Sequence, residues 1–466
     1  MDVVNEVTRL VERARAAQRI ADTYDQGRID ELVAAAGWAI LEPARNRELA
    51  ELAVADTGIG NVDDKVRKNH RKTLGLLRDL QGAKSVGVIA EHPEKGIVEI
   101  ARPVGVVCAI TPSTNPGATP ANKIINALKG RNAVVVAPSP KGWSTAARLL
   151  EFIHAQFDRI GAPRELVQLL PAPISKASTA ELMRQCDLVV ATGSQANVRA
   201  AAISGTPAFG VGAGNVAGIV DETADLALSA ERIVRSKTFD NATSCSSENS
   251  LVVVEAVRAK LLKALRDRGA VLLDAPQKAA LQRLMFPEGK LSAAATGQSA
   301  TAIAERAGLA DIALLEPRIL IVEEDGFGVE HPFSGEKLSP VLALYTARDF
   351  EHAMGIVERI YAYQGAGHSV GLHSALPERA MAIGHRLPVS RVIVDQAHSI
   401  ATGGSFDNGL PFSLSMGCGT WGKNNFSDNM NYRHYLNITR ISRPIVECVP
   451  SERELLGAYF DQYGRA

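Results

Sequence analysis

The N-terminal part of the chain carries apolar residues at the spacing of amphipathic helices. Val4, Val7 and Leu10 recur at intervals of three residues, which places them on one helix face. A polar stretch over residues 78–95, which contains glycine and proline, ends this pattern. We therefore predict a purely helical region over residues 2–82.

Further along, short apolar runs alternate with longer amphipathic stretches. The runs predict strands and the stretches predict helices. Predicted strands cover 104–110, 132–136, 166–170 and 188–191, and predicted helices cover 116–128, 144–160, 178–184 and 195–203. Strands that alternate with helices imply crossover connections and a parallel sheet, and runs that are apolar throughout indicate that both sheet faces are covered.

A second section of the same kind follows a predicted helix over residues 224–238. Its predicted strands cover 250–254, 319–322, 341–345, 369–372 and 392–394, with helices over 256–268 and 350–360. The segment 400–421 is rich in Gly, Ser and Asn, as loops are. The segment 432–441 could then form a strand of an arm. The fold class expected from these patterns is α/β.

Composition narrows the function classes. The 466 residues contain 51 basic and 51 acidic side chains, whereas proteins that bind nucleic acid or an anionic membrane usually carry a basic excess. No run of apolar residues is long enough to span a membrane. The first residues lack the basic-then-apolar pattern of a secretory signal, and the five cysteines form no CxxC pair. We therefore expect a cytoplasmic protein with no disulfide framework, no metal site and no nucleic-acid or membrane partner.

Cys245 is the candidate nucleophile. It lies in a run of small polar residues over 239–249, directly before an apolar strand. A cysteine on a polar loop near hydroxyl and amide donors is placed to act as a thiolate, whereas Cys108 and Cys186 lie in apolar elements, as structural cysteines do. Composition alone leaves open that Cys245 is an incidental loop cysteine.

An ordered set of motifs resolves that question. It comprises Cys245 together with Ile110-Thr111-Pro112-Ser113-Thr114-Asn115-Pro116, Arg131–Pro138, Ala191-Thr192-Gly193-Ser194, Glu336–Val341 and Gly365-Ala366-Gly367-His368-Ser369. Each motif is weak alone, but the set, from about residue 4 to 445, resembles the aldehyde dehydrogenase superfamily. It is most similar to the CoA-acylating branch, which includes acylating acetaldehyde, succinate-semialdehyde and sulfoacetaldehyde dehydrogenases.

The resemblance implies an aldehyde dehydrogenase-like fold. We place the N-terminal helices and a Rossmann-like cofactor-binding domain in residues 1–235 and an α/β catalytic domain in 236–424. Residues 425–466 would return to the cofactor domain, form a small oligomerisation arm and end in a helix. A homodimer or homotetramer is expected.

The resemblance also implies roles for individual residues. Cys245 would form a thiohemiacetal and then an acyl-thioester, Asn115 would donate to the oxyanion, and His368 would be an acid/base for the CoA thiol. A structural role for His368 stays open. Glu336 would hold the nicotinamide ribose. The other residues expected to bind the cofactor are Thr111, Pro112, Ser139, Lys141, Gly193, Ser194 and Gly212.

One departure from the hydrolytic enzymes bears on the reaction. Where they carry a glutamate that activates water, Gly210 stands by resemblance. Hydrolysis would then lack its general base, whereas a CoA thiol needs less help. Transfer to CoA is therefore favoured, unless another carboxylate such as Glu248 substitutes. A hydrolytic dehydrogenase and a catalytically silent, shell-associated relative are the alternatives.

Cofactor and substrate can be argued a little further. The turn after the second strand carries Ser139 and Lys141 instead of a carboxylate, which favours NADP weakly over NAD because a cation can pair with a 2′-phosphate. Polar residues near the site favour a small anionic aldehyde such as sulfoacetaldehyde or succinate semialdehyde, with acetaldehyde as the alternative. Those residues are Arg391, His398, Thr402 and Ser405.

Overall fold

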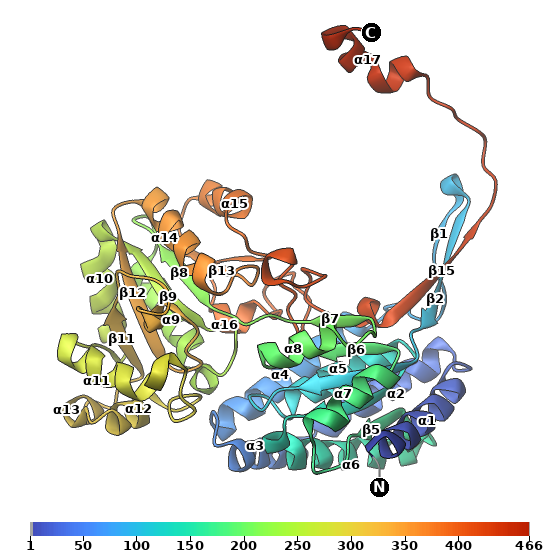
Figure 1. Ribbon diagram of the computed structural model, residues 1–466, viewed down its shortest axis with the longest axis horizontal. Helices are drawn as coiled ribbons and strands as arrows, with labels where there is room; N and C mark the ends of the chain where they lie inside the picture. The colour runs from blue at the N-terminus through green and yellow to red at the C-terminus, as the bar shows by residue number, and fades with distance from the viewer. Residues whose placement is uncertain (1–2, 466) are drawn as a thin grey trace.

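The computed structural model describes residues 3–465. Two α/β bodies lie side by side, and a long antiparallel arm projects from one of them (Figure 1). Four helices form the N-terminal layer: α1 (Val3–Ala21), α2 (Gln26–Leu41), α3 (Pro43–Thr57) and α4 (Val62–Leu80). The predicted helical start is thereby confirmed.

The first body is built on a five-stranded parallel sheet in the order β5-β4-β3-β6-β7. Its strands are β3 (Val106–Thr111), β4 (Ala133–Pro138), β5 (Val167–Leu169), β6 (Leu188–Ala191) and β7 (Ala208–Gly210). Its crossover helices are α5 (Ala118–Lys129), α6 (Trp143–Ile160), α7 (Lys176–Gln185) and α8 (Gln195–Ala202). The strand order reverses between β3 and β6, and in open α/β sheets ligands bind at the carboxyl ends of the strands at such a point.

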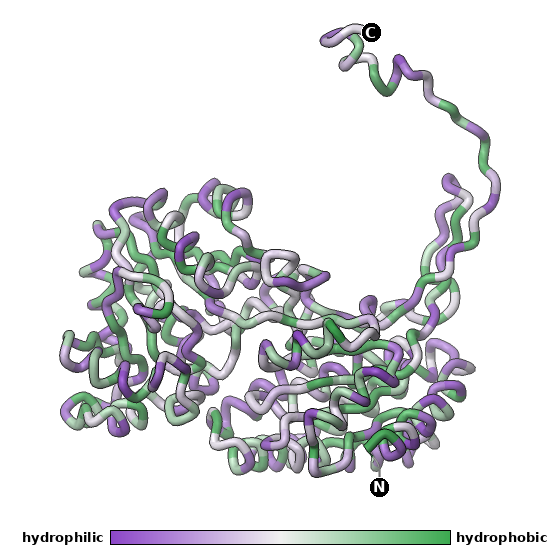
Figure 2. The backbone as a smooth tube through the Cα atoms, in the orientation of Figure 1, coloured by the Kyte–Doolittle hydropathy of each residue, from purple (hydrophilic) through white to green (hydrophobic). Residues whose placement is uncertain are grey.

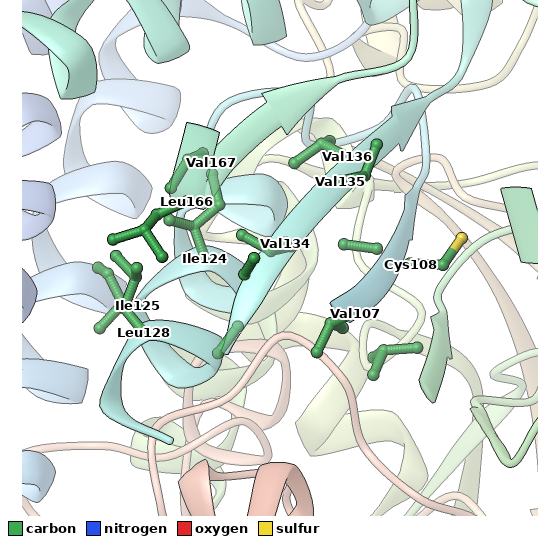
Figure 3. Close-up of a cluster of buried hydrophobic side chains, with 14 of the residues drawn as sticks. Val107, Cys108, Ile124, Ile125, Leu128, Val134, Val135, Val136, Leu166 and Val167 are labelled. Atoms are coloured by element: carbon green, nitrogen blue, oxygen red, sulfur yellow. The ribbon is translucent and has the colours of Figure 1, made fainter. Parts of the chain in front are cut away.

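The core of this body explains the continuous apolar runs. Every residue of β3 and β4 is buried, because helices cover both faces of the sheet. Figure 3 shows Val107, Val134 and Val135 of these strands in one cluster with Ile124 and Leu128 of α5. The parallel sheet with two covered faces, predicted from sequence, is confirmed.

The second body contains a seven-stranded parallel sheet in the order β10-β11-β12-β9-β8-β13-β14. Its strands are β8 (Val216–Val220), β9 (Glu248–Val254), β10 (Ala270–Leu272), β11 (Ile319–Glu323), β12 (Val341–Ala347), β13 (Val370–His373) and β14 (Val392–Val394). Its helices are α9 (Leu226–Thr238), α10 (Glu255–Arg266), α11 (Ala275–Met285), α12 (Ala300–Arg306), α13 (Ala310–Ala313), α14 (Phe350–Tyr363), α15 (Pro377–Arg386) and α16 (His398–Ala401).

Separate cores lie on the two faces of this sheet. In β9, Val252 belongs to one core, whereas Leu251 and Val253 belong to the other, as the alternation of side chains along a strand requires. The chain crosses between the two sheets over residues 211–215. By sheet membership the second body therefore begins before the boundary expected at 235, which lies inside α9; the domain limits stay a prediction.

The arm is a three-stranded antiparallel sheet in the order β1-β2-β15, of β1 (Gly87–His92), β2 (Ile97–Pro103) and β15 (Leu436–Ser442). The hairpin β1–β2 falls within and after the stretch expected to be a polar connection, and β15 is shorter than the predicted strand over 432–441. Before β15, Phe412 and Tyr435 pack into the core of the first body, so the chain returns there after the second body.

A short exposed segment follows the arm and ends in α17 (Glu452–Tyr463), far from both bodies (Figure 1). Apolar positions alternate with polar ones along this tail (Figure 2), and Val446 is 90% exposed. Over residues 3–465, none of the helices has the length and apolar character needed to cross a membrane. The cytoplasmic location stays a prediction.

Candidate active site

Cys245 lies on the loop that connects α9 to β9. It is half-buried, and its Sγ lies 3.5 Å from Nε2 of His368. Burial raises the pKa of the Cys245 thiol to about 12, and the nearby Glu336 and Cys418 act in the same direction. The thiol is therefore protonated in the resting protein, and the neighbouring imidazole is the group placed to accept its proton.

His368 belongs to a chain of buried hydrogen bonds. Its Nδ1 lies 2.8 Å from the Ser369 hydroxyl, which lies 2.8 Å from Nε2 of His398. Burial lowers the pKa of His368 to about 3, and the Arg391 guanidinium contributes to the same effect. A neutral ring whose Nδ1–H donates to Ser369 presents Nε2 as an acceptor toward Cys245, which is the tautomer that a general base needs.

Two glycines allow the loops around Cys245 to approach closely. A Cβ on Gly214 would lie 1.8 Å from the carbonyl oxygen of Cys245, and a Cβ on Gly367 would lie 1.9 Å from that of Cys418. Gly367 also has a φ of +89°, which favours glycine. The loop of Gly214 thus packs against the backbone of Cys245, and the loop of Gly367 packs against that of Cys418.

Asn115 approaches the site from the first body. It lies on the loop after β3, and its Oδ1 accepts a hydrogen bond from Lys68 Nζ at 2.8 Å. Asn115 lines the same cleft as Ser244, the residue next to the nucleophile. The structure therefore pairs Cys245 of the α9–β9 loop with His368, which lies just before β13, and places Asn115 in a cleft that reaches Ser244. Their catalytic roles stay predictions.

The cleft has a volume of about 1230 Å³ and is strongly basic. Two acidic residues, Asp64 and Glu231, line it together with eight basic residues: Arg47, Arg67, Lys68, Arg71, Lys72, Arg235, Arg268 and Arg318. Such a wall attracts anions, because a cleft that carries one sign of charge concentrates the field.

Arg71 is the most specifically arranged of these cations. Its guanidinium lies over the rings of Phe406 and Phe412, 5.3 and 5.8 Å from their centroids. Its Nη2 donates to the Ser405 hydroxyl at 2.5 Å. Its Nε is buried and has no hydrogen-bond partner among the described residues. A guanidinium that lines the cleft and is held over two rings is suited to an anionic group.

Comparison with known proteins gives the family. The aldehyde dehydrogenase family matches residues 3–283. The chain is 67% identical over 459 residues to the acylating sulfoacetaldehyde dehydrogenase of Cupriavidus necator, covering 98% of this chain and 93% of the relative. The chain belongs to the aldehyde dehydrogenase family.

Further relatives identify the branch. The acetylating succinate-semialdehyde dehydrogenase of Clostridium kluyveri is 37% identical over 458 residues, covering 97% of this chain and 100% of that one. The crystal structure of an acetylating aldehyde dehydrogenase from Geobacillus thermoglucosidasius superimposes with a TM-score of 0.91 at 36% identity, covering 96% and 98% of the two chains. The predicted membership of the CoA-acylating branch is confirmed.

Most residues expected to bind the cofactor of this aldehyde dehydrogenase lie at the carboxyl ends of β3, β4 and β6. The Ser139 amide donates to the Thr111 carbonyl at 2.9 Å, and Gly193 and Ser194 directly follow β6. The Thr111 hydroxyl is buried without a partner among the described residues, so this edge offers a ligand an unsatisfied polar atom. Pro112 is half-buried and Lys141 is exposed on the same edge. The residues present fit a dinucleotide, but their roles stay predictions.

Glu336 and Gly212, the two remaining residues expected to bind the cofactor, lie on loops near Cys245 and Cys418. Burial raises the pKa of Glu336 to about 8, although the Gly214 amide that it accepts from lowers it. The Gly212 amide donates to Asn424 at 3.3 Å, and a Cβ there would lie 3.5 Å from Cys418 Sγ. Gly212 therefore follows the carboxyl end of β7, beside β6, and also packs against the loop that carries Cys418.

The structure also bears on hydrolysis. β7 ends at Gly210, and a Cβ there would lie 2.6 Å from Val198, so position 210 supplies no side chain to activate water. The glycine-rich run over 210–214 is followed by the strand β8, whereas a dinucleotide fingerprint opens a helix. Glu248 is 2% exposed and accepts from the Ser236 hydroxyl at 2.5 Å. A buried carboxylate that is already engaged is a poor base for water entering from solvent.

One substrate expectation needs correction. Arg391 donates to Asn429 and to the backbone carbonyls of His368, Gly417 and Ser427. Its guanidinium holds the loops around the nucleophile together and is not available to the anionic tail of a substrate.

Sequence reasoning missed Arg71 and Lys68, although a signal was present. Basic residues at 65, 68 and 72 recur at helical spacing along α4, and such a stripe usually marks a solvated helix face. Here all three lysines are buried instead.

Three side chains, Glu324, Asp325 and His331, could also converge on a cation, but Glu324 already pairs with Lys278 at 3.1 Å.

Proposed function

We propose that the protein converts a small anionic aldehyde, sulfoacetaldehyde in the first place, and CoA to the corresponding acyl-CoA with NAD(P)⁺ as oxidant. The observation that carries this proposal is the Cys245–His368 pair next to a basic cleft that Asn115 and Ser244 line. The 67% identity to the Cupriavidus necator enzyme supports the choice of aldehyde.

The residues suggest how the reaction proceeds. His368 Nε2 accepts the thiol proton of Cys245, and the thiolate adds to the carbonyl carbon of the aldehyde. Asn115 Nδ2 donates to the oxyanion of the thiohemiacetal. Bound NAD(P)⁺ supplies the hydride acceptor that oxidation of this carbon to a thioester requires. His368 releases the first proton to solvent before CoA reacts. The CoA thiol then displaces Cys245 from the acyl group, and His368 accepts the proton of that thiol and returns it to the departing Cys245 thiolate.

The cofactor would bind at the carboxyl ends of β3, β4 and β6. Thr111, Pro112, Ser139, Gly193 and Ser194 would contact the adenine half and the pyrophosphate, since the amides at a helix start favour phosphate. Glu336 would bind the nicotinamide ribose, and Gly212 would leave room beside it. Exposed Lys141 supports a weak preference for NADP over NAD, since it could pair with a 2′-phosphate.

The arm and the tail support an oligomer. We take β1, β2, β15 and α17 as contacts between copies in a homodimer or homotetramer, because their apolar side chains are exposed in the single chain. Val449 is 79% exposed and Leu455 is 70% exposed, and a segment of such composition is stabilised by covering.

A substrate panel tests the proposed function. Sulfoacetaldehyde, succinate semialdehyde, acetaldehyde and propionaldehyde are each offered with NAD or NADP, with and without CoA. We expect sustained turnover only with CoA, a single burst of reduced cofactor without it, and the highest kcat/KM with sulfoacetaldehyde. Cys245→Ala should abolish turnover. Sustained turnover without CoA would identify a hydrolytic enzyme instead.

A further inference from the structure

Lys68 of α4 is buried against the site, although no step of the reaction uses it. It is 5% exposed, and its Nζ contacts three oxygens. They belong to Asn115 Oδ1 at 2.8 Å, Asp240 Oδ2 at 2.5 Å and Thr243 Oγ1 at 3.1 Å. One ammonium group therefore links the helical layer, the loop after β3 and the loop that carries Cys245.

The contact to Asn115 fixes which end of its amide faces the cleft. The oxygen and nitrogen of an asparagine amide have nearly the same shape, so the hydrogen-bond partners decide the orientation. An ammonium can only donate, so it requires Oδ1 on its side. Nδ2 is then turned away from Lys68, and its one contact among the described residues is long, 3.5 Å to Thr114 Oγ1.

We propose that Lys68 is a positioning residue that holds the Asn115 amide with its Nδ2 donor directed to the oxyanion of the substrate. The inference rests on the proposed role of Asn115 in the reaction. Without Lys68 the amide would be free to turn, and an Oδ1 facing the oxyanion would repel it. The effect of Lys68 on the rate is thus exerted only through Asn115.

The surroundings of Lys68 make it a rigid support. Asp240 begins three consecutive non-glycine residues with positive φ, at 51°, 51° and 59°, a costly backbone that persists only when its surroundings hold it. Lys68 and Lys65 both pair with Asp240 Oδ2, and its Oδ1 accepts from the Asn61 amide at 3.0 Å. The ammonium that orients Asn115 is therefore itself anchored to a fixed turn.

Lys65 provides a matched control. It lies one turn earlier on α4, is 3% exposed, and pairs with the same Asp240 oxygen at 3.2 Å. It donates to the Thr114 carbonyl at 3.2 Å but does not contact the Asn115 side chain. Lys65→Met and Lys68→Met thus remove equal charge from one buried carboxylate, and only Lys68→Met releases the amide.

The experiment measures the burst of reduced cofactor in a single turnover without CoA, together with steady-state kcat and KM. We expect Lys68→Met to slow the burst by about tenfold, somewhat less than the loss of an oxyanion donor, with KM within about twofold of the wild type. Lys65→Met should change the burst rate and KM by no more than about twofold relative to the wild type. Lys68→Gln, which can still donate to Oδ1, should recover part of the loss and also replaces Lys68→Met if that variant does not fold.

A double-mutant cycle separates positioning from general destabilisation. In an Asn115→Ala background, Lys68→Met should have no further effect on the burst rate, because the group it positions is gone. Equal losses in Lys65→Met and Lys68→Met, or an undiminished loss in the Asn115→Ala background, would overturn the inference and leave the proposed reaction intact. If Asn115→Ala itself leaves the burst unchanged, the proposed oxyanion donor fails, and the inference fails with it.

Discussion

Ser369 connects the two buried histidines, so its hydroxyl should control how readily Cys245 loses its proton. Ser369→Ala removes the acceptor of the His368 Nδ1–H and the donor to His398, two contacts of 2.8 Å each. When His368 accepts the thiol proton it becomes an imidazolium, and a hydrogen bond to a charged group contributes about 1.5–3 kcal/mol. Loss of that contact should therefore slow thiolate formation by about 10- to 100-fold.

Alkylation by iodoacetamide measures this step directly. The rate of labelling at Cys245 is followed by mass spectrometry, and exposed Cys448 serves as the reference within the same sample. In the wild type, labelling of Cys245 at pH 7 should be slower than that of Cys448, because burial raises the pKa of the Cys245 thiol to about 12 and leaves little thiolate.

Ser369→Ala should lower the Cys245 rate relative to Cys448 at every pH, and the burst of reduced cofactor should fall by the same factor. Ser369→Thr keeps a hydroxyl and is the matched control. The Ser369 carbonyl accepts from Tyr361 at 2.6 Å, which anchors the backbone in both variants. An unchanged ratio of labelling rates in Ser369→Ala would refute the view that the histidine pair activates the nucleophile.

Three more predictions concern substrate, packing and assembly. Arg71→Met should lower kcat/KM for sulfoacetaldehyde by about 10- to 100-fold, the value of a charge-assisted contact. The kcat/KM for propionaldehyde should change by no more than about twofold. Equal losses for both aldehydes would contradict a role in anion binding. Gly214→Ala should abolish the burst of reduced cofactor, because its Cβ would meet the Cys245 carbonyl oxygen at 1.8 Å. Circular dichroism should show that the variant is still folded. A normal burst would show that the loop relaxes freely. A chain that ends at Arg443 should form a smaller species in light scattering after gel filtration, and an unchanged mass would exclude the tail from the interface.

The layered fold followed from sequence because it rests on local patterns. The run Val106–Ile110 is apolar at every position and buried at every position, so its place inside a parallel sheet could be predicted. The hairpin β1–β2 could not, because its strands are half-exposed. Their side chains do not alternate clearly between core and solvent, so no periodic pattern marks them.

The candidate site divides in the same way. Cys245 and His368 stand in recognisable motifs, but what holds them depends on contacts between distant parts of the chain. Asp240 is 175 residues from Lys65 in sequence, and a lysine on a helix carries no sign of whether it will meet a buried carboxylate or water. Arg391 was misassigned for the same reason, because four backbone and side-chain partners occupy it only in the folded protein.

The protonated state of Cys245 has a consequence for the durability of the enzyme. Peroxides and disulfides react with thiolates and hardly at all with thiols, so a nucleophile whose pKa is raised to about 12 is poorly reactive toward oxidants while it waits for substrate. The proton that His368 removes during turnover thus also shields the sulfur from oxidation in the resting enzyme. Oxidative inactivation should be confined to the fraction of time in which the enzyme is at work.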